Sequence, residues 1–109
     1  MPSRQAIPEE VKQQALRIIA KFNRRYLAKR GSAYEPRWSG SFLFLDRLDH
    51  GMVSQICRLK YTGDMQRWEF AIFKYSSEQY HPKERWFPGA DCVDGTIEGA
   101  MKAGMMAYA

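Results

Sequence analysis

The sequence predicts an α+β domain in which one amphipathic helix lies at each end of an antiparallel sheet. Near both ends of the chain, apolar residues recur at three- and four-residue steps, the pattern of a helix with one buried side. Between these ends, runs rich in strand-forming residues are separated by short turns. The predicted order is α-β-β-β-(β)-α, with a three- to four-stranded sheet and both helices packed on one face.

The first helix is predicted over residues 8–30. Pro8 suits the first turn because its missing N–H would have no partner there, and Gly31 suits the left-handed conformation that ends a helix. The apolar residues of its buried stripe are Val11, Ala15, Ile18, Ile19, Phe22 and Tyr26.

Three strands are predicted, over residues 41–48, 52–61 and 67–75, with a tight turn at His50 and Gly51. Alternation places Val53, Cys57 and Leu59 on one face of the second strand. In the third strand, Trp68, Phe70 and Ile72 share one face and Phe73 takes the other. If the first set faces the helices, Phe73 and Tyr75 lie outward beside Phe42 or Phe44 and form an aromatic outer face.

Two further segments are ambiguous. Residues 34–40 contain Pro36 and Gly40 among aromatic residues, which indicates a connection or a short edge strand. Residues 85–87 offer one more short edge strand.

The last helix is predicted to begin near Asp94, a favourable residue before a first turn. Its buried stripe comprises Val93, Ile97, Met101, Gly104, Met105 and Tyr108. Because the helix is rich in glycine and alanine, its backbone is expected to lie close to the sheet.

Composition indicates a single domain over residues 1–109. The chain is 45% hydrophobic and 27% charged, which is enough apolar material for one core and too short a chain for two. No apolar run approaches the roughly 18 residues that span a bilayer, and no apolar segment follows Arg4, so we expect a cytoplasmic protein with no membrane partner. Cys57 and Cys92 are expected to be free thiols.

The positive charge is concentrated in the first helix. Six of the 17 basic residues lie within residues 17–30, where no acidic residue occurs, so the rest of the chain carries 11 basic against 12 acidic residues. Arg17, Lys21, Arg24 and Arg25 are predicted to form a ridge that contacts nucleic-acid phosphates without reading sequence. The alternative is an ordinary solvated face opposite the apolar stripe.

The α-β-β-β-α order resembles that of double-stranded-RNA-binding domains over most of the chain. In that family a lysine-rich cluster opens the second helix and grips phosphates. The corresponding stretch here, residues 94–98, carries Asp94 and Glu98 and no basic residue, so the resemblance is confined to element order.

A second candidate surface is the loop over residues 80–89. Tyr80, Arg85, Trp86 and Phe87 are residue types that anchor protein interfaces, and the prolines of this loop stiffen it. The loop and the aromatic outer face favour a protein-interaction module or a homodimer. The alternative is that Trp86 and Phe87 fold under the domain as an extension of its core.

No motif indicates a cofactor or a metal. His50, Cys57, His81 and Cys92 lack the two- to four-residue spacing of paired metal ligands. His81, Asp91 and Cys92 could be assembled by folding into a thiolate and its base, although no spacing requires it. The sequence therefore favours a binding domain over an enzyme.

Overall fold

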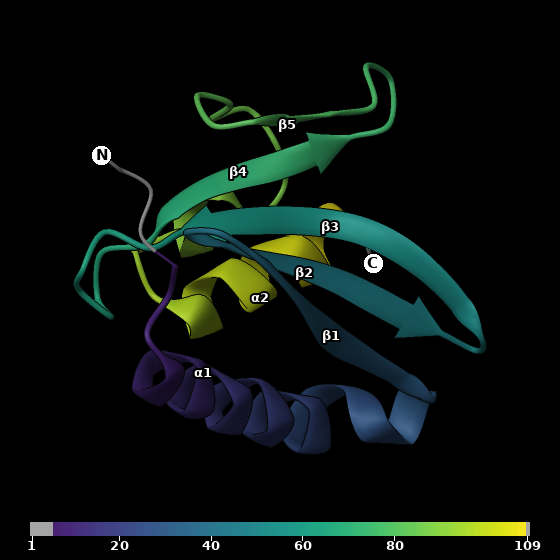
Figure 1. Ribbon diagram of the computed structural model, residues 1–109. Helices are drawn as coiled ribbons and strands as arrows, with labels where there is room; N and C mark the ends of the chain where they lie inside the picture. Colours follow the sequence, from purple (N-terminus) through teal and green to yellow (C-terminus); the bar gives the residue numbers. More distant parts are fainter. Residues whose placement is uncertain (1–5, 109) are drawn as a thin grey trace.

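The computed structural model describes residues 6–108 and contains a five-stranded antiparallel sheet with both long helices on one of its faces (Figure 1). The strand order is β1-β2-β3-β4-β5. The strands are β1 Ser32–Ser39, β2 Phe42–Asp49, β3 Met52–Lys60, β4 Glu69–Lys74 and β5 Gln79–His81. The helical elements are α1 Glu9–Phe22, the π-helix η1 Asn23–Leu27, the 3-10 turns η2 Ala28–Arg30 and η3 Ala90–Cys92, and α2 Ile97–Ala107. The predicted α+β class is confirmed.

The two edge strands of the sheet, β1 and β5, settle the two segments that the sequence left ambiguous. Residues 34–39 belong to β1, an eight-residue edge strand that tolerates Pro36 because it has a neighbour on one side only, and Gly40 lies in the turn that follows. The prediction of a strand at residues 85–87 is wrong, and the fifth strand is β5. Here the Trp86 backbone N–H donates to the Glu84 carboxylate, at 2.9 Å, and not to a neighbouring strand.

The first helix runs to Arg30 and ends at Gly31, which has φ +72° as predicted. However, η1 winds more widely than an α-helix, so the buried stripe steps by five residues from Phe22 to Leu27. Leu27 is completely buried and Tyr26 is 39% exposed. The prediction that Tyr26 belongs to the buried stripe is therefore wrong.

A bulge in the β2–β3 pair changes which side chains of β3 face the core. The pairing register shifts between Leu45 and Asp46, and Ile56 is the extra residue on β3. Cys57 and Leu59 are both buried, whereas Val53, beyond the bulge, is 60% exposed. The prediction that Val53 shares their face is therefore wrong.

Helix α2 begins at Ile97, three residues after the predicted start. Thr96 is the capping residue, and its hydroxyl accepts a hydrogen bond from the Gly99 N–H at 2.9 Å. Asp94 supports this cap from outside the helix, because its carboxylate accepts from the Thr96 N–H and hydroxyl. These bonds hold the pKa of Asp94 below its ordinary value, with the Thr96 side chain as the largest cause. The close approach predicted for the last helix is confirmed, since a Cβ on Gly104 would lie 2.5 Å from Ile56 Cγ2.

Candidate functional site

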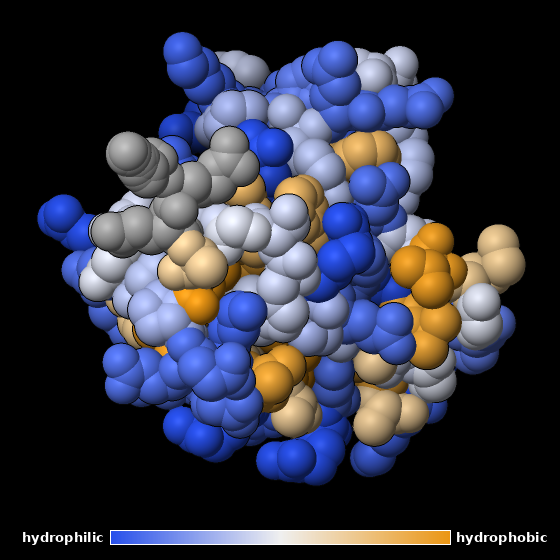
Figure 2. All heavy atoms as spheres, in the orientation of Figure 1, coloured by the Kyte–Doolittle hydropathy of each residue, from blue (hydrophilic) through white to orange (hydrophobic). Residues whose placement is uncertain are grey.

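The basic residues of the first helix form one solvent-facing surface, which we call the basic surface. Its members are all exposed: Arg17, Lys21, Arg24, Arg25, Lys29 and Arg30. The ion pairs found within residues 6–108 join Arg37 to Asp46, Arg47 to Asp49 and Lys74 to Glu84, and so involve none of them. Figure 2 shows hydrophilic side chains along the lower edge of the molecule, where α1 and the turns after it run in Figure 1. The six positive charges are thus available to an anionic partner.

The π-helix adds an aromatic ring to the basic surface. The guanidinium carbon of Arg25 lies 5.5 Å from the ring centroid of Tyr26, and the Tyr26 ring packs against Phe22 at 4.7 Å. Sequence reasoning missed this placement because it assumed 3.6 residues per turn throughout the helix. The available signal was Leu27, an apolar residue that would otherwise have had no place in the buried stripe.

Asn23 fixes the end of the helix that carries Arg24 and Arg25. Its side-chain oxygen accepts from the Tyr34 N–H at 2.8 Å, and its side-chain nitrogen donates to the Tyr34 carbonyl at 3.0 Å. The Tyr34 hydroxyl in turn donates to the Met101 carbonyl on α2, at 2.7 Å. Burial of this hydroxyl raises the pKa of Tyr34 well above its ordinary range. The basic surface is therefore presented by a firmly anchored helix.

A cluster of rings and guanidinium groups covers the sheet face opposite the helices. Phe44 and Phe73 both contact the ring of Tyr80, with centroids 5.4 and 5.0 Å away. Arg37 lies over Phe44 at 4.4 Å, and Arg58 lies over the ring of Phe42 at 4.7 Å. Of the rings predicted to lie outward, Phe42 and Phe44 are half-buried under arginine side chains and Phe73 is buried. Tyr75 is exposed but packs against Tyr108, with centroids 5.7 Å apart.

Polar contacts hold this cluster in place. Asp46 accepts two hydrogen bonds from the Arg37 guanidinium, at 3.0 and 3.2 Å. Gln55 donates to the Tyr80 hydroxyl at 3.2 Å, and burial raises the pKa of Tyr80. The outer face is consequently an internally satisfied polar and aromatic layer.

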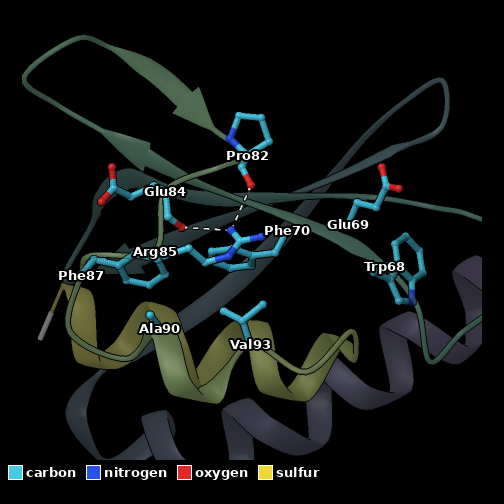
Figure 3. A pocket seen from close by; sticks show the side chains of 9 residues that line it. All are labelled: Trp68, Glu69, Phe70, Pro82, Glu84, Arg85, Phe87, Ala90 and Val93. Carbon is cyan, nitrogen blue, oxygen red and sulfur yellow. Dashed lines mark hydrogen bonds between the residues drawn. The ribbon is translucent and has the colours of Figure 1, made fainter.

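The structure separates the four predicted loop residues. Tyr80 belongs to β5 and the outer face, whereas the ring of Phe87 stacks on Phe70 with centroids 5.9 Å apart and planes 17° from parallel. Trp86 is 90% exposed. Arg85 lies in a hollow of about 500 Å³ beside β4 (Figure 3). The hollow is lined by Trp68, Glu69, Phe70, Pro82, Glu84, Arg85, Phe87, Ala90 and Val93.

The thiols and imidazoles occupy separate environments. Cys57 is fully buried, and this burial raises the pKa of its thiol far above the usual range. Cys92 is partly exposed, with its Sγ 3.8 Å from the Met106 sulfur, while His81 Nε2 lies 2.6 Å from the Ser77 hydroxyl. Residues 6–108 contain no group of three or more side chains placed to hold a metal ion.

The chain matches no family model, no curated protein and no solved structure. Across the described part of the chain, no helix is long and apolar enough to cross a membrane. Function must therefore be argued from the surfaces themselves.

Proposed function

We propose that this protein binds the backbone of nucleic acids through the basic surface, without reading base sequence. The observation that supports this most strongly is the exposure of six cations within residues 17–30, a stretch without an acidic residue. Cations that contact phosphates release condensed counterions, which favours binding at low salt whatever the base sequence.

The dimensions of the basic surface suit a polyanion. At a rise of about 1.5 Å per residue, residues 17–30 extend over about 20 Å. One strand of a duplex presents about six phosphates over that length. The anchoring of Asn23 to Tyr34 reduces the conformational freedom that the helix would lose on binding.

A titration with duplex and single-stranded oligonucleotides at two salt concentrations tests the proposal. We expect binding at low salt that weakens strongly as salt rises. Arg24→Glu/Arg25→Glu should reduce the affinity by at least about tenfold. Lys83→Glu/Lys102→Glu makes the same charge change at exposed positions outside the basic surface, and its effect should be clearly smaller. Absence of binding at low salt, or equal losses in both variants, would contradict the proposal.

A second candidate function is protein interaction, favoured by the 90% exposure of Trp86. An indole on a proline-flanked loop supplies a large apolar contact at low entropic cost. Sedimentation at high micromolar concentration tests for a homodimer. A dimer that dissociates in Trp86→Ala supports this function, and a monomer in the native protein argues against self-association.

A further inference from the structure

We propose that the hollow beside β4 binds a small aromatic carboxylate. Its volume of about 500 Å³ lies within the range of small-molecule sites in proteins. The apolar part of its wall comprises Trp68, Phe70, Pro82, Phe87, Ala90 and Val93. The hollow includes no residue of the basic surface, so this site is independent of the proposed nucleic-acid binding.

Arg85 supplies a positive charge whose position is fixed by its own loop. Its Nη1 donates to the carbonyls of Pro82 and Glu84, each at 3.2 Å. Figure 3 shows the guanidinium reaching across the hollow toward Phe70. These two bonds use Nη1 alone, so the N–H groups of Nε and Nη2 remain to bind a carboxylate in the fork geometry that arginine favours.

The carboxylate nearest to Arg85 in sequence does not neutralise it. One oxygen of Glu84 accepts from Lys74 Nζ at 2.8 Å, and the other accepts from the Trp86 N–H at 2.9 Å. The Lys74 hydrogen bond is the largest cause that lowers the pKa of Glu84. In Figure 3 the carboxylates of Glu84 and Glu69 both point away from the guanidinium. No ion pair among the described residues involves Arg85, so its guanidinium can pair with an anionic ligand.

The exposed edge of β4 adds backbone hydrogen-bonding groups. Strand β5 pairs with β4 only from Ile72 to Lys74, and the Trp68 N–H donates to the Gly95 carbonyl at 2.8 Å. Phe70 lies midway between Trp68 and Ile72. Because alternate residues of a strand direct their backbone groups to the same side, the N–H and C=O of Phe70 face the hollow. They offer a ligand one donor and one acceptor.

Trp68, which lines the same wall, carries an unpaired polar atom beneath the surface of the hollow. Its side chain is 3% exposed, and its Nε1 has no hydrogen-bond partner among the described residues. A buried donor without a partner is energetically costly, so binding that brings an acceptor to it would be favoured. Together with the stacked rings of Phe70 and Phe87, these groups suit a flat apolar body that carries a carboxylate.

Titration of the full chain with phenylacetate, followed by amide and indole NMR signals, tests the proposal. We expect saturable shifts at Trp68 Nε1 and the Phe70 amide, with a Kd of about 1 mM or lower. Phenylacetamide keeps the ring without the charge, and acetate keeps the charge without the ring. Each should bind at least about tenfold more weakly than phenylacetate.

The variant Arg85→Gln should lose the preference for phenylacetate over phenylacetamide, whereas Lys83→Gln, an exposed neighbour, should keep it. The amide spectrum of each variant reports whether it is folded. The proposal is overturned if phenylacetate shifts no signal around the hollow at about ten times the expected Kd. Equal binding of phenylacetate and acetate, or an unchanged preference in folded Arg85→Gln, would overturn it as well.

Discussion

The side chain of Asn23 is hydrogen bonded to both backbone groups of Tyr34, with its oxygen 2.8 Å from the N–H and its nitrogen 3.0 Å from the C=O. β1 is an edge strand, so no neighbouring strand is present to bond these two backbone groups, and the Asn23 amide bonds them instead. The Asn23 side chain thus makes the two hydrogen bonds that a neighbouring strand would make. These bonds join the helix that carries the basic surface to the sheet.

Replacing Asn23 by alanine removes both bonds and leaves two partly buried backbone groups without partners. We expect Asn23→Ala to lower the free energy of unfolding by about 1–3 kcal/mol in urea denaturation. Gln14→Ala, on the exposed side of α1, should change it by less than about 0.5 kcal/mol. If Asn23→Ala lowers the free energy of unfolding no more than the control does, the Asn23 amide does not stabilise the attachment of the helix to β1.

The π-helix predicts opposite sensitivities for two adjacent residues. Leu27 is completely buried, so Leu27→Ala should destabilise the protein by about 2–5 kcal/mol. Tyr26 is 39% exposed, so Tyr26→Ala should cost about 1 kcal/mol or less. An uninterrupted α-helix predicts the reverse ranking, which thermal or urea unfolding of the two variants would reveal.

Gly104 tests the close approach of α2 to the sheet. Helix propensity alone predicts that Gly104→Ala stabilises the protein by about 1 kcal/mol. Because the added Cβ would lie 2.5 Å from Ile56 Cγ2, we expect destabilisation by about 1–3 kcal/mol instead. The sign of the change in unfolding free energy decides between the two, and Lys102→Ala on the exposed side of α2 is the control.

The lowered pKa of Asp49 predicts that the protein loses stability as the pH falls. The Ser32 hydroxyl, followed by the Arg47 guanidinium, holds the pKa of Asp49 below its ordinary value. A lowered pKa contributes stability above the unfolded value of about 3.9, and this contribution disappears as the pH falls through the folded value. Asp49→Asn should therefore be less stable than the native protein at pH 7, with a difference that shrinks below about pH 4. A constant difference across this range would contradict the account.

Local signals predicted the class, the two helices and the main hairpin. Gly31 marked the end of the first helix, and His50 with Gly51 marked a turn in which both residues have positive φ. The predictions that were wrong, the burial of Tyr26 and the face of Val53, depended on contacts between residues distant in sequence. The wide turn that exposes Tyr26 begins at Asn23, whose side chain bonds Tyr34 of β1. The bulge between Val53 and Cys57 contains Ile56, whose side chain lies against Gly104 of α2.

The candidate sites divide in the same way. The basic surface could be predicted because all its charges lie within one helical segment, residues 17–30, and only their exposure to solvent is required. The hollow could not, because it requires Phe70 of β4 to meet Phe87 of the loop, and no sequence spacing encodes that stacking.

The slope of log affinity against log salt concentration, measured with one oligonucleotide, tests the proposed function most directly. With a duplex, four to six phosphate contacts through the basic surface predict a slope of about −3.6 to −5.4 for the native protein. In Arg17→Gln/Lys21→Gln the slope should be smaller in magnitude by about 1.8, because two contacts are removed. A native protein whose affinity does not depend on salt, or a variant with the native slope, would contradict phosphate binding by this helix.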